Sequence, residues 1–116
     1  MVRGEIYFVN LAPRSGSERS GRRPCIVVSH DAFNANPRWH TVTVVPLTTA
    51  ERWQRASPIT IQFTAGEGNL PKACSGLAHQ VTTVDKGKIV DAALGRLSEA
   101  RMTAVNSALS NYLQLA

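Results

Sequence analysis

Residues 24–30 of the chain read Pro24-Cys-Ile-Val-Val-Ser-His30, a nearly continuous apolar run. Such a run, bounded by proline, is typical of a β-strand that is buried on both faces. Two segments on either side have a related character. Gly4–Asn10 is rich in β-forming residues, and Thr41–Leu47 is β-branched, with Pro46 marking an edge strand or a bulge. The pattern therefore predicts a mainly β (α+β) domain.

The rest of the chain supplies shorter strands and one helix. Pro58–Phe63 alternates with a period of two, which predicts a strand with one solvated face. Weaker strands are expected at 73–79 and 89–97, separated by a turn at Asp85–Gly87. Ser98 is a natural N-cap for a C-terminal helix. That helix carries an apolar stripe at three- and four-residue spacing, which predicts a core or dimer face: Met102, Val105, Leu109, Tyr112 and Leu113. We expect five to seven short strands in a small barrel-like sheet, followed by this packing helix.

The composition is that of one globular domain. The chain has 116 residues, of which 43% are hydrophobic, and this is enough for a core. No apolar run reaches the ~18 residues of a membrane span, and the first residues do not resemble a signal peptide. Cys25 and Cys74 lack CxxC or Cys/His spacing, which favours buried thiols in a reducing compartment. We expect a single domain over 1–116 in the cytoplasm, with no membrane segment.

The formal net charge of +5 is unevenly distributed. Residues 1–58 contain eight basic residues, all of them arginine, against four acidic ones. Half of these arginines lie in the Gly/Ser-rich segment 13–23, between the first two predicted strands: Arg14, Arg19, Arg22 and Arg23. A guanidinium binds phosphate through paired N–H donors, so this loop predicts an anion site with nucleic acid as the first candidate ligand. The alternative is an ordinary solvated surface.

The arginine-rich loop also contains one carboxylate, Glu18. Cleavage of RNA without a metal requires a base for the 2′-hydroxyl proton and a group that stabilises the charge developing on the phosphate. A carboxylate can serve as the base, a guanidinium can stabilise the charge, and a threonine hydroxyl can donate to a phosphate oxygen. The alternative for Glu18 is a surface ion pair with a neighbouring arginine. The sequence lacks a P-loop, a GxSxG motif and metal-ligand spacing, so no metal or other cofactor is expected.

Six short motifs are spread along the chain. They are Gly4–Tyr7 (GEIY), Gly16–Ser29 (GSERSGRRPCIVVS), Val44–Thr49 (VVPLTT), Gly68–Lys72 (GNLPK), Gln80–Lys86 (QVTTVDK) and Leu94–Ser98 (LGRLS). In this order, and over essentially the whole chain, they closely resemble the MazF/PemK family of toxin endoribonucleases. The single domain over 1–116 is therefore expected to be a MazF/PemK-like toxin domain.

The resemblance implies a fold, an activity and several partners. The fold would be a compact SH3-like β-barrel of the PemK/CcdB type with a C-terminal helix, assembled as a homodimer. The activity would be metal-independent cleavage of single-stranded RNA, often mRNA, at short sequences. The products would carry 2′,3′-cyclic phosphate and 5′-hydroxyl ends, and the loss of RNA would inhibit translation and growth. The controlling partner would be the antitoxin of a type II toxin–antitoxin system, whose acidic flexible tail blocks the site.

The family's functional residues map onto particular positions of this sequence. The resemblance implies three catalytic residues: Arg23 directly before the loop-closing proline, Thr48 at the end of VVPLT, and Glu18 in the Gly-Ser-Glu element. Arginine titrates above ~12, so we expect Arg23 to stabilise transition-state charge rather than to donate a proton. Thr48 would contact the phosphate, and Glu18 would act as the base or orient Arg23. The expected RNA-binding residues are Ser17, Arg19, Arg22, His79, Gln80 and Lys86.

His79 departs from the family pattern, in which an aspartate often precedes the glutamine. It either only contacts RNA or the partner subunit, or it acts as a near-neutral acid or base. Two other functions stay open at this point. Toxins of the same fold poison a protein target such as DNA gyrase without nuclease activity, and a catalytically inactive barrel could still bind nucleic acid. The presence of Arg23, Glu18 and Thr48 together favours the nuclease.

Overall fold

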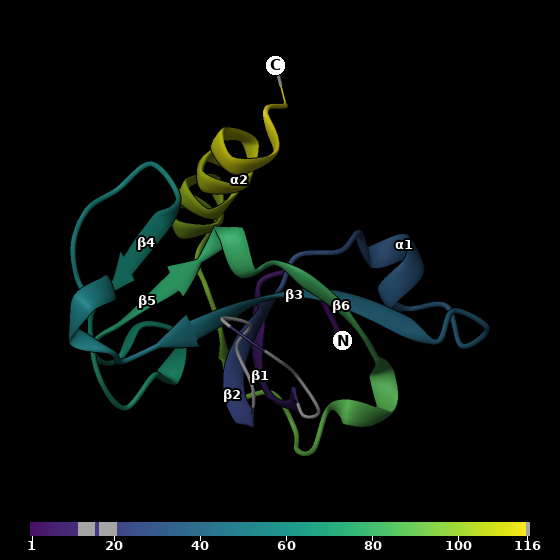
Figure 1. Ribbon diagram of the computed structural model, residues 1–116. Helices are drawn as coiled ribbons and strands as arrows, with labels where there is room; N and C mark the ends of the chain where they lie inside the picture. The colour runs from purple at the N-terminus through teal and green to yellow at the C-terminus, as the bar shows by residue number, and fades with distance from the viewer. Residues whose placement is uncertain (12–15, 17–20, 116) are drawn as a thin grey trace.

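The computed structural model describes residues 1–11, 16 and 21–115. Within these ranges, seven strands form one antiparallel sheet, and helix α2 packs across it (Figure 1). The strands are β1 (Glu5–Asn10), β2 (Arg22–Val27), β3 (Thr41–Thr48), β4 (Thr60–Phe63), β5 (Cys74–Leu77), β6 (Thr82–Asp85) and β7 (Gly95–Arg96). The α-helices are α1 (Asp31–Asn34) and α2 (Glu99–Leu113), and the 3-10 turns are η1 (Glu51–Trp53), η2 (Glu67–Asn69), η3 (Ala78–Gln80) and η4 (Lys86–Lys88).

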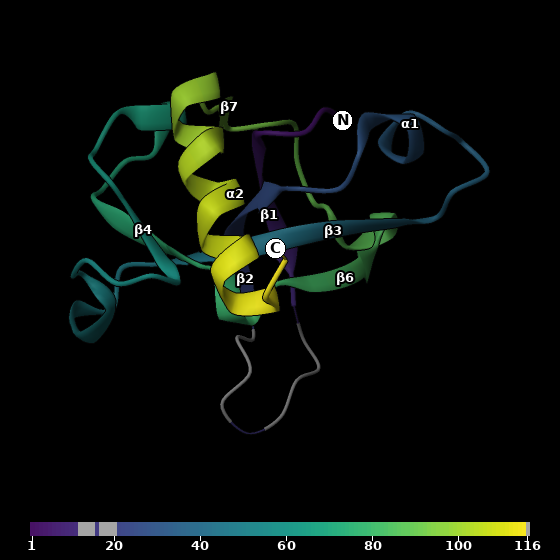
Figure 2. The ribbon, with the colours of Figure 1, turned by 90° about the horizontal axis from the view of Figure 1, so that it is seen from above.

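Strand β3 is the centre of the sheet. The strand order is β4-β5-β3-β2-β1-β7, and β6 also pairs with β3. The first half of β3 pairs with β6 and its last two residues pair with β5, while β2 lies along the other side. This change of partner accompanies the strong curl of the sheet, which forms a half-barrel (Figures 1 and 2). Pro46 lies between the β6 and β5 pairings, where the missing N–H does not interrupt either ladder.

The core has two parts, one on each face of the central strands. Ile26, Val45 and Leu47 belong to a buried cluster with Met102 and Val105 of α2. The alternating residues of the same strands form a second cluster on the opposite face: Cys25, Val27, Val42 and Val44, together with Val9, Leu11 and Val84. The prediction of a strand buried on both faces at residues 24–30 is therefore confirmed for β2.

The C-terminal helix begins where the sequence predicts. The Ser98 hydroxyl oxygen accepts the N–H of Arg101 at 3.3 Å and caps α2. Met102 and Val105 of the predicted stripe are buried, and Ala108 is buried with them. Tyr112 and Leu113, however, are about half exposed, in the last turn of α2, which stands above the sheet (Figure 1).

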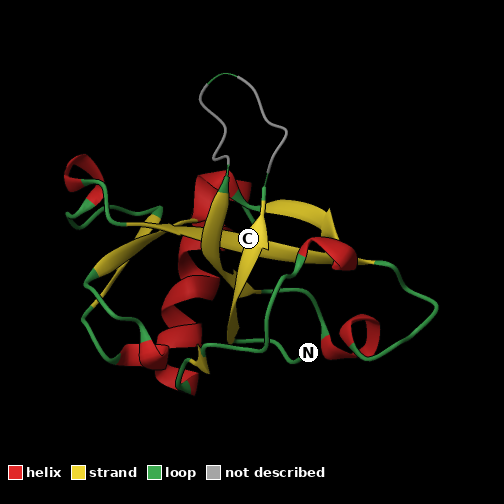
Figure 3. Ribbon diagram, turned by 90° about the horizontal axis from the view of Figure 1, so that it is seen from below, coloured by secondary structure: helices red, strands yellow, loops and turns green. Residues whose placement is uncertain are grey.

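Two strand predictions were wrong. The structure has a strand at Thr82–Asp85, which pattern reading placed partly in a turn. Conversely, only Gly95–Arg96 of the weak strand expected at 89–97 forms a named strand, and Ile89 makes an isolated bridge to Val9. Strands cross the middle of the molecule, and short helical turns lie at their ends (Figure 3). None of the described helices is long and apolar enough to span a membrane.

Candidate active site at the end of strand β3

Arg23 and Thr48 come together because of the pairing between β2 and β3. In this antiparallel register Cys25 lies opposite Pro46, so a further step of two residues sets Arg23 opposite Thr48. A small pocket of about 90 Å³ lies there. We call it the arginine pocket, and its lining residues are Arg22, Arg23, Pro24, Leu47, Thr48, Thr49 and Cys74. The fold thus joins two of the three predicted catalytic residues, which are 25 positions apart in sequence.

The Thr48 hydroxyl is held in a defined orientation. The residue is only 4% exposed, and its Oγ1 accepts the backbone N–H of Ala50 at 3.1 Å. No residue in the described part of the chain accepts the Thr48 hydroxyl hydrogen. A hydroxyl that accepts from the backbone and retains its hydrogen can donate to an anion in the pocket.

A side-chain network fixes the backbone just after β3. The Gln54 amide donates to the carbonyl oxygens of Thr48 at 2.8 Å and Ala50 at 3.1 Å. The Gln54 carbonyl oxygen in turn accepts the hydroxyl of Ser75 at 3.0 Å. Ser75 is fully buried and pairs directly with Thr48 across β3 and β5. Gln54 therefore ties the end of β3 both to its own following turn and to β5.

The two arginines of the pocket have different surroundings. Arg22 donates to the Asp91 carboxylate at 2.7 Å, and its guanidinium lies 4.3 Å from the centre of the Phe8 ring. Arg23 is half-buried, and it lines the pocket beside Pro24. Among the described residues that line the pocket, none is a carboxylate. The pocket therefore presents positive charge and a hydroxyl donor, the combination that stabilises a phosphate in a transition state.

Cys74, the first residue of β5, lines the arginine pocket. Burial raises the pKa of its thiol to about 11, and the nearby Glu67 carboxylate adds to this shift. At neutral pH the group is thus a protonated thiol, which is a poor nucleophile. Cys74 therefore contributes an apolar surface to the pocket and not a reactive group.

The other predicted site residues are distributed differently. Glu18, Ser17 and Arg19 lie outside the described residues. His79 is half-buried in η3, where its ring lies 4.8 Å from Trp53 and 6.2 Å from Tyr112. Gln80 follows it and is also half-buried. Neither His79 nor Gln80 lines the arginine pocket, so their roles in RNA binding stay predictions.

Lys86 lies at the other end of β3 from Thr48. It follows Asp85, which pairs with Thr41, seven residues from Thr48 and about 23 Å away along the strand. Its ammonium donates to the carbonyl oxygens of Phe33, Asn34 and Asn36 at 3.1–3.3 Å. In this arrangement Lys86 holds the end of α1, and it is not part of the arginine pocket.

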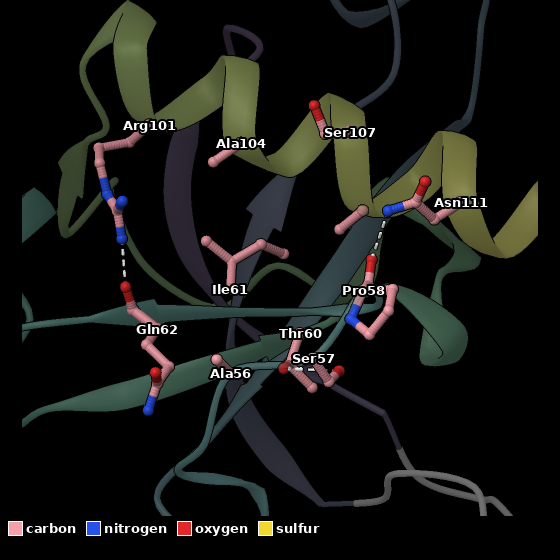
Figure 4. A pocket seen from close by; sticks show the side chains of 11 residues that line it. Ala56, Ser57, Pro58, Thr60, Ile61, Gln62, Arg101, Ala104, Ser107 and Asn111 are labelled. Atoms are coloured by element: carbon pink, nitrogen blue, oxygen red, sulfur yellow. Dashed lines mark hydrogen bonds between the residues drawn. The ribbon is translucent and has the colours of Figure 1, made fainter.

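A larger groove of about 560 Å³ lies between β4 and α2 (Figure 4). Small side chains such as Ala104 and Ser107 line it, and Arg101 is the one charged residue among its described lining residues. The Arg101 guanidinium is already bound to Glu67 at 2.9 Å and to the Gln62 carbonyl. In the described ranges, moreover, no three His, Cys, Asp or Glu side chains gather as they would around a metal ion. The arginine pocket is thus the best candidate for an active site.

Sequence reasoning missed two contributors to this site. Gln54 lies in a polar segment that looks like an ordinary loop, and Cys74 lies in a predicted weak strand. Both reach the site through the pairing of β3 with β5, in which Thr48 lies opposite Ser75. A strand register of this kind depends on contacts between distant segments, and no local sequence signal reveals it.

Comparison with known proteins places this architecture in a family. The sequence profile of the PemK-like, MazF-like toxins of type II toxin–antitoxin systems matches residues 2–113. The chain belongs to this family. The match includes Arg23 and Thr48, and it confirms the family suggested by the six sequence motifs.

Named relatives of this PemK/MazF-like toxin cover nearly its whole length. The endoribonuclease MazF9 of Mycobacterium tuberculosis is 32% identical over 118 residues, covering 99% of this chain and 98% of the relative. The endoribonuclease EndoA of Bacillus subtilis is 30% identical over 113 residues, covering 97% and 94%. Among solved structures, an endoribonuclease in complex with its cognate antitoxin from a Mycobacterial species is 27% identical, with a TM-score of 0.78 and coverage of 100% and 97%. These similarities confirm the predicted fold class, a mainly β (α+β) domain of the PemK type with a C-terminal helix, in which the antiparallel sheet forms a curled half-barrel.

Proposed function

We propose that this PemK/MazF-like toxin is an endoribonuclease that cleaves single-stranded RNA at the arginine pocket. The observation that carries the proposal is the β2–β3 register, which sets Arg23 opposite the oriented hydroxyl of Thr48 in a pocket where none of the described lining residues is a carboxylate. The curated relatives MazF9 and EndoA are named endoribonucleases, which supports the same activity here.

The proposed reaction is an intramolecular transfer of the phosphate. The 2′-oxygen of the RNA attacks the adjacent phosphorus, so that a bond from the 2′-oxygen to phosphorus forms while the bond to the 5′-oxygen breaks. The 2′-hydroxyl proton passes to a base, and the departing 5′-oxygen takes a proton from solvent. The products are a 2′,3′-cyclic phosphate and a 5′-hydroxyl, and no metal ion takes part.

Three polar residues of the pocket have distinct roles in the proposed reaction. The Arg23 guanidinium stabilises the additional negative charge on the non-bridging oxygens, and the Thr48 hydroxyl donates to one of them. Arg22, held by Asp91 and the Phe8 ring, extends the positive surface along the RNA backbone. Glu18, which lies outside the described residues, is proposed from the sequence as the base or as the group that orients Arg23.

Two partners complete the proposal. The half-exposed side chains of Tyr112, Leu113 and Leu115 leave an apolar surface at the end of α2, which supports a homodimer. An acidic antitoxin tail complements the positive charge of Arg22 and Arg23 at the arginine pocket, and a solved relative is in complex with its cognate antitoxin. Light scattering should show a dimer for the wild type and a monomer for Leu113→Glu.

The activity is tested with a long single-stranded RNA in the presence of EDTA. We expect cleavage at a small set of sites, with 2′,3′-cyclic phosphate and 5′-hydroxyl ends. Thr48→Val preserves the shape of the side chain but removes the hydroxyl, so it should slow cleavage by about 10²-fold. The matched control is Thr103→Val on the exposed face of α2, which should cleave at the wild-type rate. Absence of cleavage, or cleavage only with added Mg²⁺, would overturn the proposal.

A further inference from the structure

A second cavity adjoins the arginine pocket. Its volume is about 110 Å³, and it shares Pro24, Thr49 and Cys74 with the arginine pocket. The remaining walls come from Phe8 of β1, from Leu94 before β7 and from the end of the η2 loop. We call this second cavity the apolar pocket. The three shared residues make the two pockets parts of one continuous surface.

The walls of the apolar pocket suit a flat uncharged ring. Phe8, Pro24, Leu70 and Leu94 provide apolar surfaces, and the protonated thiol of Cys74 continues them. The volume is about a third of that of the smallest pockets that hold drug-sized molecules, which fits a single ring. Bases of single-stranded nucleic acid stack on surfaces of this kind, and a base is attached through its ribose to the neighbouring phosphate.

The apolar pocket is formed in advance of binding. Gly95 approaches the backbone of Gly68 so closely that an added Cβ would lie 2.2 Å from the Gly68 carbonyl oxygen. The Asn69 side-chain amide also donates to the Leu94 carbonyl at 3.0 Å. These contacts join the segment that contains Leu70 to the segment that contains Leu94, so they fix the two walls of the pocket relative to each other. A ligand therefore has little ordering to impose on the walls when it binds.

The one charged side chain among the described residues of the apolar pocket is a hydrogen-bond donor. Lys72 is exposed at the rim, and its ammonium has no hydrogen-bond or ion-pair partner in the described part of the chain. Thr49 is exposed, and its hydroxyl can either donate or accept. No carboxylate lines the apolar pocket among residues 1–11, 16 and 21–115. A ring that presents a carbonyl oxygen at the rim can accept from the Lys72 ammonium, whereas a ring that presents an amino group there cannot.

We propose that the apolar pocket binds the pyrimidine base beside the scissile phosphate and that Lys72 selects uracil over cytosine. Uracil presents the O4 carbonyl at the position where cytosine presents the N4 amino group. The Lys72 ammonium can donate a hydrogen bond to the O4 carbonyl of uracil. It cannot form one with the N4 amino group of cytosine, because both groups are donors. The proposal rests on the proposed ribonuclease function, because the arginine pocket must hold the phosphate that positions this base.

The test measures binding and cleavage separately. Two short oligonucleotides differ only by uracil or cytosine beside the cleavage position, and a 2′-deoxy substitution there prevents cleavage. Fluorescence anisotropy should show about tenfold tighter binding of the uracil oligonucleotide, the value of a hydrogen bond to a charged group. Lys72→Met retains the apolar stem and should abolish this preference, while Lys88→Met, a matched change outside both pockets, should preserve it. Because no cleavage is needed, the result does not depend on catalysis.

A second variant tests the apolar pocket itself. Leu94→Trp should fill the pocket and weaken binding of both oligonucleotides to a similar level, with circular dichroism confirming that the variant is folded. Equal binding of uracil and cytosine by the wild type would overturn the proposal, as would a Lys72→Met variant that loses affinity but keeps its preference. If Leu94→Trp disturbs only antitoxin binding, the pocket holds an antitoxin side chain and the proposal is wrong. Failure of the ribonuclease function would appear instead as intact RNA in the cleavage assay.

Discussion

Gln54 is the side chain on which the position of Thr48 depends most directly. It makes three hydrogen bonds, two from its amide to the carbonyls of Thr48 and Ala50 and one from the Ser75 hydroxyl to its own oxygen. Gln54→Ala removes all three and leaves the fully buried Ser75 hydroxyl without this partner. At about 1 kcal/mol for each bond, the free energy of unfolding should fall by about 2–4 kcal/mol. The melting temperature should fall by about 10 °C.

The same substitution should affect catalysis. Without Gln54, the backbone that follows β3 is no longer tied to β5, and the Thr48 hydroxyl loses its fixed position. A displacement of ~1 Å in a catalytic group can reduce the rate by about 100-fold, so single-turnover cleavage should slow by about 10- to 100-fold below the melting temperature. Arg23 and Thr48 themselves are unchanged in this variant.

Two further variants separate the network from a general loss of stability. Gln54→Glu can still accept the Ser75 hydroxyl but cannot donate to the two carbonyls, so it should resemble Gln54→Ala in urea unfolding. Gln62→Ala removes an exposed glutamine side chain on β4 and should alter the unfolding free energy by less than about 0.5 kcal/mol. Wild-type stability and cleavage in Gln54→Glu would refute the reasoning, because the amide donors would then be dispensable.

Three other perturbations test separate parts of the structure. Gly95→Ala should lower the free energy of unfolding by about 2 kcal/mol or more in thermal denaturation, because its Cβ would lie 2.2 Å from the Gly68 carbonyl oxygen. Ser98→Ala removes the N-cap of α2 and should lower the urea-unfolding free energy by about 1 kcal/mol, and an unchanged midpoint would contradict the capping role. The Cys74 thiol, with its pKa raised from 9.0 to about 11, stabilises the folded state fully below pH 9. This contribution should disappear as the pH rises toward 11, and alkylation of Cys74 at pH 8, mapped by mass spectrometry, should be much slower in folded than in urea-unfolded protein.

The long strands and the helix start were predictable because their signals are local. β3 and the Pro24–Val27 part of β2 consist of apolar and β-branched residues, and Ser98 is followed directly by helix-forming residues. Strand β6 was missed because only one of its four residues, Val84, is buried, which leaves a weak local pattern. The strand forms because it pairs with the first half of β3. Similarly, Gly95 of β7 pairs with Ile6 of β1 and lies close to Gly68, and both are contacts between distant segments.

The candidate site was predictable in part. Arg23 and Thr48 were identified from family motifs, and the β2–β3 register explains why they meet. Lys86 belongs to the same set of motifs, yet its ammonium holds the end of α1 about 23 Å along β3 from Thr48. The order of motifs along the chain does not show whether a residue lies near the first or the last residue of β3. That information is available only from the register of the sheet.

Single-turnover cleavage of RNA in EDTA by Arg23→Ala and Arg38→Ala tests the central claim most directly. Both variants lose one guanidinium, but Arg38 is exposed in the segment after α1 and does not line the arginine pocket. We predict that Arg23→Ala slows cleavage by about 10²- to 10³-fold, while Arg38→Ala cleaves near the wild-type rate and yields the same cyclic phosphate ends. Equal rates for the two variants would contradict the assignment of the arginine pocket as the active site.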